Sequence, residues 1–438
     1  MSSQKQKTDA ITRQLQKIER LISTGKYPDA ANALQAAEQA SPGDPRIYLL
    51  LSRLAEHNGN PKAALGAMER AVKTLPNWPV SAIELALLLA RQNQQTAAVD
   101  QAIYALGLAP ESLDLLTRAI DIAHDAQQFS LALEWLRRAE KLAPANRQLK
   151  QLIAFDLKIL GYNADAIAAY TELLASDKGD TTALLGRAQA ALASGDLDLA
   201  QRDCSALLVL DSSNEEYRFW TELAHGRTPT TQPLTIVRKL HDDMADVYDE
   251  HLVRSLRYQL PKQVAELITA RYPDHKLNVL DLGCGTGLLG VCLGRIDGAL
   301  VGVDLSEKMV AKAIRHNVYD RFHTVNLLDA LQATPQAQYD VIAACDVFIY
   351  VGDLTEAIPN AHRILIPGGH LIFSIEAATQ DEANLVLRPT MRYAHQSKHI
   401  ETLCRDAGFD DVSLESTVLR FEGGEPINGF IVVAHKSK

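Results

Sequence analysis

The chain has 438 residues, enough for two or three domains. Its residues are 47% hydrophobic and 22% charged, a composition that is ordinary for a globular protein and excludes a mainly disordered one. The 54 acidic side chains outnumber the 44 basic ones and give a net charge of −10, which argues against nucleic-acid binding across the whole surface.

Cysteine, histidine and hydropathy patterns add further expectations. The five cysteines contain no C-x-x-C pair, so we expect no disulfide framework. The thirteen histidines show no spacing typical of metal ligands, so we expect no metal. The first ten residues are polar, and no run of 18 apolar residues occurs. We therefore expect a cytoplasmic protein that neither crosses a membrane nor binds one.

The first half of the chain is an array of 34-residue repeats. After a polar tail (1–10), alanine recurs in every repeat and proline follows it in four of the six copies. A small residue lets two helices cross closely, and the proline ends the second helix of each pair. The spacing predicts six antiparallel helix pairs over residues 11–214. The repeated positions are Ala30, Ala64, Ala98, Ala132, Ala166, Ala200, Pro42, Pro76, Pro110 and Pro144.

This pattern resembles the tetratricopeptide repeat. The resemblance implies an α-solenoid with a groove lined by recurring positions of the first helices, because one unit alone cannot bury its apolar face. Two roles are open for the groove. It binds a protein or peptide, or it serves self-association or acts as a scaffold for the second half. The groove positions include Leu49, Arg53, Ile83, Leu87, Thr117, Asp121, Phe155 and Leu185.

Residues 215–238 are expected to cap and then leave the repeats. Residues 215–226 have the pattern of a capping helix, and residues 226–237 read GRTPTTQPLTIV. Two prolines, a glycine and four threonines are typical of a linker. The second domain is therefore expected to span 239–438.

In this second domain, short apolar runs alternate with helical stretches, which predicts a parallel sheet with helices on both faces. The last two strands follow each other without a helix and predict an antiparallel hairpin, the seventh strand being inserted at the sheet edge. The expected strands are 277–282, 299–304, 322–326, 339–345, 369–375, 411–419 and 427–434, and the expected helices include 261–271, 286–295, 307–317, 353–364 and 396–407.

A glycine-rich turn follows the first of these strands, in the words VLDLGCGTG. Gly283, Gly285 and Gly287 let backbone N–H groups approach a ligand and tolerate positive φ. The turn also fits the dinucleotide fingerprint of dehydrogenases. Asp281 argues against that alternative because it would repel a pyrophosphate and attract a cationic sulfonium ligand. A helix-capping or turn acid is the less favoured role for Asp281. The predicted hairpin likewise differs from the dehydrogenase sheet.

The second strand ends in VGVDLS, which places Asp304 at its tip, 17 residues beyond Gly287. An acid near this distance typically accepts two ribose hydroxyls, and Ser306 is available to cap the next helix instead. Met309 is placed either to pack on an adenine face or to fill the core.

Together with YDVIAACDV and LIPGGHLIFSIE, these words resemble a class I S-adenosylmethionine-dependent methyltransferase with a Rossmann-like, seven-stranded domain. The catalytic half is also similar to a vertebrate relative from the Williams–Beuren region, and the whole chain to bacterial methyltransferases with repeats. The resemblance implies S-adenosylmethionine as cofactor. The expected cofactor contacts are Asp281, Gly283, Gly285, Gly287, Asp304, Leu305, Met309, Asn326, Leu327 and Asp346, with Asp329 near the adenine position.

The acceptor is expected beyond the carboxyl ends of the strands. Asp346 is a candidate to orient the cofactor, hold the acceptor or act as base. Arg392, Tyr393 and His395 together suggest a clamp for a carboxylate or phosphate, with His395 also a catalytic candidate. The other candidates are Tyr350 and Glu376 on the acceptor side, and Tyr248 and His251 on a lid helix.

We expect an enzyme that methylates an oxygen or nitrogen of a small molecule, with no general base needed unless the acceptor must lose a proton. One alternative is a protein methyltransferase that recruits its target through the repeats. The other is a scaffold that binds the cofactor without catalysis. The expected partners are the small substrate and a protein or second copy on the repeats, and not nucleic acid.

Overall fold

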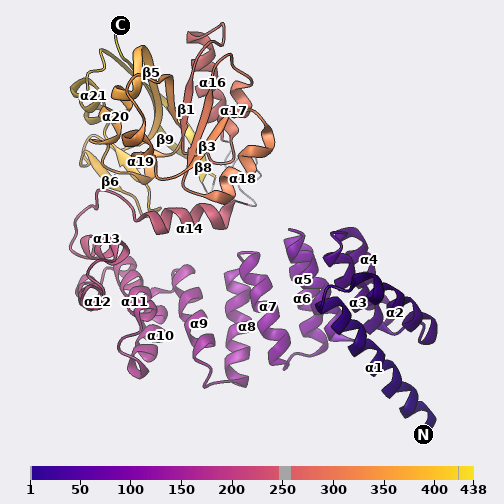
Figure 1. The fold of residues 1–438 in the computed structure, drawn as a ribbon. Helices are drawn as coiled ribbons and strands as arrows, with labels where there is room; N and C mark the ends of the chain where they lie inside the picture. Colours follow the sequence, from indigo (N-terminus) through magenta and orange to yellow (C-terminus); the bar gives the residue numbers. More distant parts are fainter. Residues whose placement is uncertain (1, 246–257, 423) are drawn as a thin grey trace. The chain divides into compact units, whose positions relative to one another are not determined.

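The computed structural model describes residues 2–245, 258–422 and 424–438, with the backbone alone for residues 2–9 (Figure 1). Tyr248 and His251 lie outside the described residues. The chain divides into two compact units, Met1–Leu210 and Asp211–Lys438.

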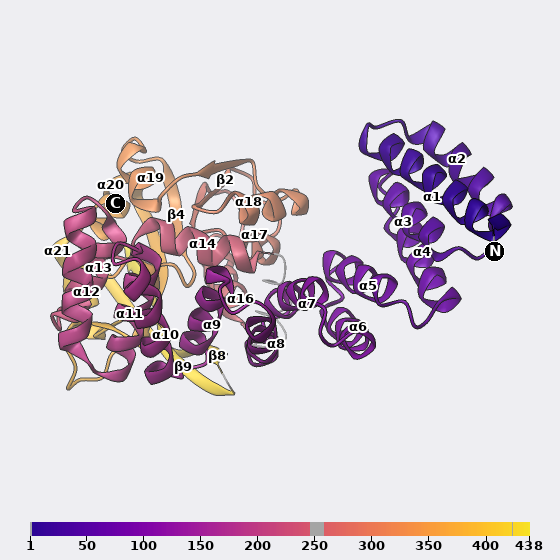
Figure 2. The same ribbon diagram turned by 90° about the horizontal axis from the view of Figure 1, so that it is seen from below.

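The first unit is a stack of twelve helices in six pairs, as the 34-residue period predicts. All six repeated alanines are completely buried, and each of the four repeated prolines lies two residues beyond a helix end. Figure 2 shows the helices following one another in chain order. They are α1 (Ser2–Ser23), α2 (Tyr27–Ala40), α3 (Pro45–His57), α4 (Pro61–Thr74), α5 (Pro79–Arg91), α6 (Gln95–Leu108), α7 (Leu113–Asp125), α8 (Phe129–Leu142), α9 (Arg147–Ile159), α10 (Asn163–Ser176), α11 (Thr181–Ser194) and α12 (Leu197–Leu210).

The second unit is built on one mixed sheet of nine strands. All seven predicted strands occur, and β1 to β5 run parallel in the order β3-β2-β1-β4-β5. The predicted hairpin is present, with β9 antiparallel to both β5 and β8. Two short strands, β6 and β7, were not predicted, because three residues each is too short for a periodic signal. The strands are β1 (Val279–Leu282), β2 (Leu300–Asp304), β3 (Arg321–Thr324), β4 (Tyr339–Ala344), β5 (Leu365–Ala377), β6 (Leu385–Leu387), β7 (Tyr393–His395), β8 (Asp411–Glu422) and β9 (Glu425–His435).

Helices cover both faces of the sheet and bury a separate apolar core on each. One core includes residues of α16 and α17, and the other includes residues of α20 and α21. This arrangement confirms the Rossmann-like α/β fold. The helices are α13 (Glu215–Ala224), α14 (Leu234–Met244), α16 (Leu260–Arg271), α17 (Leu288–Leu293), α18 (Glu307–Ala313), α19 (Leu327–Ala333), α20 (Ala357–Ile364) and α21 (Ser397–Asp406), with the 3₁₀ turns η2 (Ile314–His316) and η3 (Phe348–Tyr350).

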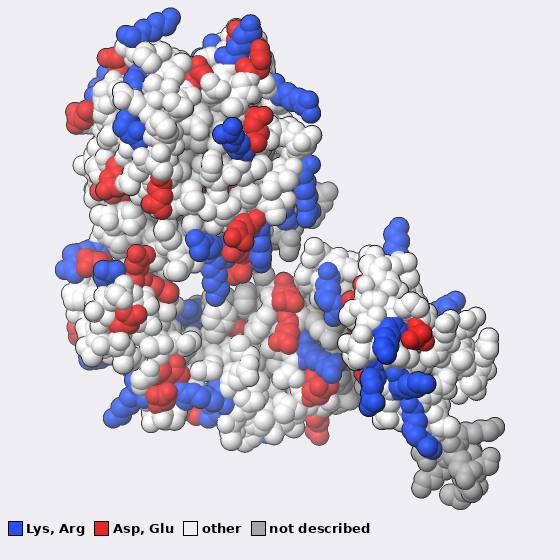
Figure 3. All heavy atoms as spheres, in the orientation of Figure 1, with Lys and Arg blue, Asp and Glu red and all other residues white. Residues whose placement is uncertain are grey.

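The surface carries both charge signs. On the face that Figure 3 displays, lysine and arginine side chains are interspersed with acidic ones. Among the helices that the structure describes, none combines the length and hydropathy that a membrane span requires.

Candidate functional site

A cavity of about 630 Å³ lies at the carboxyl ends of β1, β2 and β4, within the second unit. The loops after these strands line one side of it, and Asn326 and Leu327 from the start of α19 extend that side. The opposite side comes from α13, the segment Thr228–Pro233 and α14. Parallel α/β sheets bind ligands at this end, so the cavity is the candidate site.

The glycine turn forms the floor of the cavity. Gly283 and Gly285 have φ of 62° and 54° and both line the cavity. A Cβ on Gly283 would overlap the side chain of Val347, so the turn requires glycine there. Gly287 has φ of 89° and begins α17, where a Cβ would lie 3.1 Å from Ala313. Gly287 therefore allows the turn to pack against Ala313. It is not among the described residues that line the cavity.

Asp304 lies at the tip of β2 and faces the cavity, with Leu305 beside it. Its Oδ2 accepts the Gly285 N–H at 2.8 Å, and its Oδ1 accepts the Ser306 N–H at 2.8 Å. Burial raises the pKa of Asp304, and these hydrogen bonds oppose that shift. Ser306 caps α18 by accepting the Met309 N–H, as the sequence predicts. The Asp304 carboxylate is thus fixed at the edge of the glycine turn.

The side chains of Asp281 and Met309 lie behind the cavity lining and are not part of it. Asp281 is buried at the end of β1 and accepts the Tyr319 hydroxyl at 2.6 Å. Burial raises the pKa of Asp281 to about 7. The hydrogen bond from Tyr319 opposes this shift in part. Met309 is completely buried. Neither side chain belongs to the cavity lining among the described residues, so both lie in supporting positions behind it, and their contact with the cofactor stays a prediction.

On the third strand's side, Asn326 and Leu327 line the cavity. Asn326 also caps α19, its Oδ1 accepting the Leu328 N–H at 3.4 Å. Asp329 is exposed in the first turn of α19, outside that lining.

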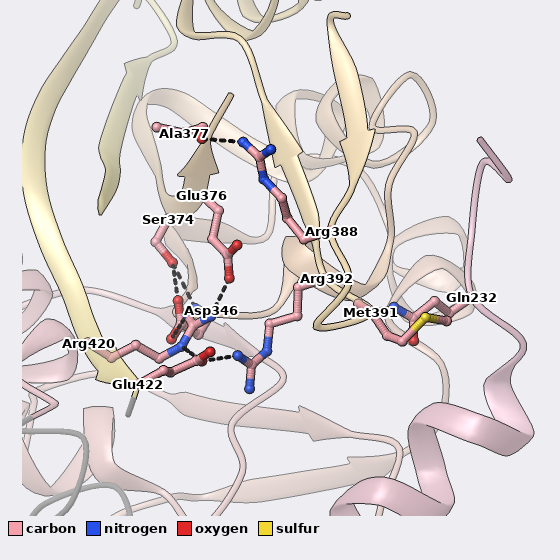
Figure 4. Close-up of polar contacts among 10 residues, drawn as sticks. All are labelled: Gln232, Asp346, Ser374, Glu376, Ala377, Arg388, Met391, Arg392, Arg420 and Glu422. Atoms are coloured by element: carbon pink, nitrogen blue, oxygen red, sulfur yellow. Dashed lines mark hydrogen bonds and ion pairs between the residues drawn. The ribbon is translucent and has the colours of Figure 1, made fainter. Parts of the chain in front are cut away.

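Asp346 follows β4 and lines the cavity with its side chain 13% exposed. Its N–H donates to Ser374 Oγ at 2.8 Å, and the Ser374 hydroxyl donates to Asp346 Oδ1 at 3.3 Å. Arg420 Nη1 donates to Asp346 Oδ2 at 3.1 Å. Figure 4 shows Ser374 and Arg420 on either side of Asp346.

Arg420 is the centre of a buried ionic cluster that sequence reasoning missed. It also pairs with Glu376 through Nη2, and its Nε donates to Glu422 Oε1 at 2.6 Å. Arg392 pairs with Glu422 at the outer end of the cluster (Figure 4). Burial raises the pKa of Glu376, and Arg420 opposes the shift. Glu376 and Arg392, expected to bind the acceptor, are thus engaged in this cluster and do not line the cavity.

The structure does not bring the residues of the expected anion clamp to the cavity. Tyr393 is completely buried, and its hydroxyl donates to the Pro229 carbonyl at 2.9 Å. His395 is 1% exposed, and its Nε2–H donates to the Gly352 carbonyl at 2.6 Å. Burial lowers the pKa of His395 to about 4, so the ring is neutral near pH 7. Neither residue lines the cavity, and a catalytic role for His395 is therefore excluded from our proposal.

The expected linker is instead bound to the second unit as a wall segment, Thr228–Pro233. The Thr230 carbonyl accepts the Asp353 N–H at 2.7 Å, and the Gln232 side chain donates to the Met391 carbonyl (Figure 4). A Cβ on Gly352 would overlap the Thr230 carbonyl oxygen, so the segment and η3 approach too closely for any other residue there. The threonine-rich sequence of the wall segment did not indicate that it packs against the sheet domain.

Aromatic side chains complete the cavity lining. Tyr350 lines it, as expected, and its ring meets that of His241 edge-on with centroids 5.1 Å apart. His241 from α14 and Phe219 from α13 also line it and were not predicted. Within the described ranges, no group of three or more His, Cys, Asp or Glu side chains could hold a metal ion.

Comparisons with known proteins match both halves. Residues 252–414 match a family model described as a methyltransferase domain, and residues 15–82 and 160–215 match a tetratricopeptide-repeat model. Relatives include two ubiquinone biosynthesis O-methyltransferases. The one from Hydrogenovibrio crunogenus is 26% identical over 36% of this chain and 69% of its own. The one from Coxiella burnetii is 31% identical over 28% of this chain and 51% of its own.

The chain thus spans about half to two thirds of the curated relatives it matches. Among solved structures, a Synechocystis magnesium protoporphyrin IX methyltransferase is 22% identical with a TM-score of 0.36, over 47% of this chain and 99% of its own. The repeat protein YrrB is 16% identical with a TM-score of 0.38, over 44% and 98%. The Williams–Beuren similarity stays a prediction. The family models show that the chain joins tetratricopeptide repeats to a methyltransferase domain.

Proposed function

We propose that the second unit transfers a methyl group from S-adenosylmethionine to an oxygen or nitrogen of a small-molecule acceptor. The observation that carries the proposal is one cavity whose lining joins the glycine turn, the Asp304 carboxylate and Asp346. The O-methyltransferase names of the relatives favour oxygen as the methyl acceptor.

The residues present fit the cofactor. The turn at Gly283 and Gly285 leaves no side chain between backbone and ligand, and Asp304 offers a carboxylate held from two backbone N–H groups. Such a carboxylate is suited to ribose hydroxyls. Asn326 and Leu327 line the adjacent wall and are placed for the adenine side. S-adenosylmethionine, when bound, supplies a methyl group on a positively charged sulfur.

The protein's contribution is positioning and the exclusion of water, which together are worth about 7–11 kcal/mol in well-oriented reactions. The wall segment and α14 close the acceptor side, and Val347, Tyr350 and Val351 face it from the sheet. Asp346 is the carboxylate on that side, where it is placed to accept a hydrogen bond from an acceptor hydroxyl or amine.

The size of the cavity favours a small acceptor. A volume of about 630 Å³ falls within the roughly 300–1,000 Å³ of small-molecule sites, and the cofactor takes part of it. We propose that the repeats bind a protein partner or a second copy, a role typical of such solenoids.

Calorimetric titration of the full-length chain tests the first step. S-adenosylmethionine and S-adenosylhomocysteine should bind one per chain, and NADH should not. Labelled S-adenosylmethionine is then offered with matched catechols, phenols and amines, and separately with proteins from a cell lysate. Methylation of a small molecule supports the proposal. Label entering protein alone supports recruitment through the repeats, and NADH binding without the methyl donor overturns both.

A further inference from the structure

Asp346 has a left-handed backbone conformation, which is uncommon for residues other than glycine and which Asp adopts more readily than most. Its φ is 55°, in the left-handed region, and it directly precedes Val347 on the cavity wall. Two hydrogen bonds with Ser374 hold both its backbone N–H and its Oδ1. The orientation of Asp346 is therefore set by its neighbours.

Arg420 reaches Asp346 because β8 carries a bulge. Val418 pairs with Asn428 and Arg420 with Ile427, so the pairing register shifts by one residue at Leu419. Leu419 and Arg420 are consecutive and both buried, where regular alternation would expose one of them. A bulge re-aims a side chain in this way. Arg420 extends from β8 to Asp346, which follows β4 (Figure 4).

The cluster around Arg420 is costly to bury. Arg420 is 2% exposed and contacts three carboxylates, those of Asp346, Glu376 and Glu422. A buried ionic cluster seldom stabilises a fold more than apolar packing would. Of the three carboxylates, Asp346 alone lines the cavity, whereas the other two hold Arg420 from the far side.

We propose that Arg420 is a positioning residue for methyl transfer, which holds the Asp346 carboxylate on the cavity wall toward the sulfur of the bound methyl donor. This inference rests on the proposed function. Glu376 fixes one end of the guanidinium, and Glu422, itself paired with Arg392, fixes the other. Arg420 thus orients the Asp346 carboxylate from β8, and the described residues of β8 contribute no side chain to the cavity lining.

The test compares two ligands that differ by one charge. S-adenosylmethionine carries a sulfonium and S-adenosylhomocysteine a neutral thioether. A carboxylate aimed at the sulfur therefore raises the affinity for the first over the second. A general loosening of the fold weakens both equally, so the affinity ratio reports the position of Asp346. Both affinities are measured by calorimetry in the full-length chain.

The variants are Asp346→Asn, Arg420→Gln, Arg420→Lys and the double variant Asp346→Asn with Arg420→Gln. Arg388→Gln is the matched control, since Arg388 pairs with Glu382 and donates to the Ala377 carbonyl nearby without contacting Asp346 or the cavity (Figure 4). We expect the ratio to fall about tenfold in Asp346→Asn and in Arg420→Gln, and no further in the double variant. Arg420→Lys should be intermediate because an ammonium lacks the guanidinium's fork.

A wild-type ratio in Arg420→Gln, equal weakening of both ligands, or additive effects in the double variant would each overturn the positioning role. So would an unchanged ratio in Asp346→Asn. Thermal unfolding shows whether Arg420→Gln folds. If it does not, the folded Arg420→Lys variant decides. A wild-type ratio in that variant overturns the positioning role, and a lowered ratio supports it. Failure of the wild-type chain to bind either ligand would instead refute the proposed function.

Discussion

The hydroxyl of Tyr393 on β7 donates a hydrogen bond to the carbonyl oxygen of Pro229, 164 residues earlier in the chain. Both residues are buried, and the bond ties the wall segment to the sheet domain. The segment expected to separate two domains is therefore part of one of them.

Replacing Tyr393 by Phe should loosen the wall segment, because the buried Pro229 carbonyl loses its donor at a cost of about 1–3 kcal/mol. Limited trypsin digestion measures this as cleavage after the exposed Arg227, which should become several-fold faster. Tyr162→Phe is the control, since Tyr162 is 54% exposed. Equal cleavage rates in the two variants would contradict the tie.

Replacing Asp304 by Ala should weaken S-adenosylhomocysteine binding by about 1.5–3 kcal/mol, through the loss of charge-assisted hydrogen bonds. Titration calorimetry measures the change. Asp329→Ala should bind normally because Asp329 is exposed and lies outside the described lining. Unchanged affinity in Asp304→Ala would remove this carboxylate from the site.

Replacing Gly283 by Ala should reduce S-adenosylhomocysteine affinity at least tenfold, because the new Cβ overlaps Val347 and distorts the turn. Gly294→Ala is the control, since Gly294 also has a positive φ, 72°, and nothing lies within 4 Å of its Cβ. Because its ψ of −160° lies in a backbone region essentially restricted to glycine, the control should lose stability alone, by about 1–3 kcal/mol. Similar affinity losses in both would show that strain, and not the overlap, matters.

Replacing Asp281 by Asn should flatten part of the pH dependence of stability. Burial raises the pKa of Asp281 to about 7 from 3.8, so its contribution is full below about pH 4 and is lost as pH rises through 7. Between pH 5 and 7 the variant should gain on the wild type by up to about 1.4 kcal/mol per pH unit. Urea unfolding measures this difference, with exposed Asp381→Asn as control. Parallel curves would refute the shift.

Replacing His395 should change the pH dependence of stability in the opposite direction. Burial lowers its pKa to about 4 from 6.5, so its contribution is full above about pH 6.5 and is lost as pH falls through 4. His395→Gln keeps an N–H for the Gly352 carbonyl and does not titrate. Urea unfolding from pH 7.5 to 4.5 should show the wild type losing stability faster than the variant. A constant difference would argue against a buried neutral ring.

Periodic features were predictable from the sequence. The 34-residue spacing of Ala64 and Ala98 reflects a close helix crossing that each repeat must make, and the structure buries both completely. The strand and turn words around Gly283 and Asp304 are local, so these elements could be predicted in chain order. Short elements such as β6 carry too few residues for a pattern.

Contacts between distant segments could not be predicted. Arg392, Tyr393 and His395 are neighbours in sequence, yet their partners are a carboxylate on β8, a carbonyl of the wall segment and a carbonyl after η3. Arg420 finds Asp346 across 74 residues, through a bulge that no residue type signals. Side-chain chemistry indicates what a residue can bind, whereas the partner depends on the tertiary fold.

The place of the wall segment decides where this chain can be divided. A recombinant fragment that starts at residue 239 would omit α13 and Thr228–Pro233, and with them one side of the reaction chamber. A single proteolytic cleavage after Arg227 would likewise detach the wall segment, Thr228–Pro233, from α13. A fragment meant to retain the chemistry should begin at or before Asp211.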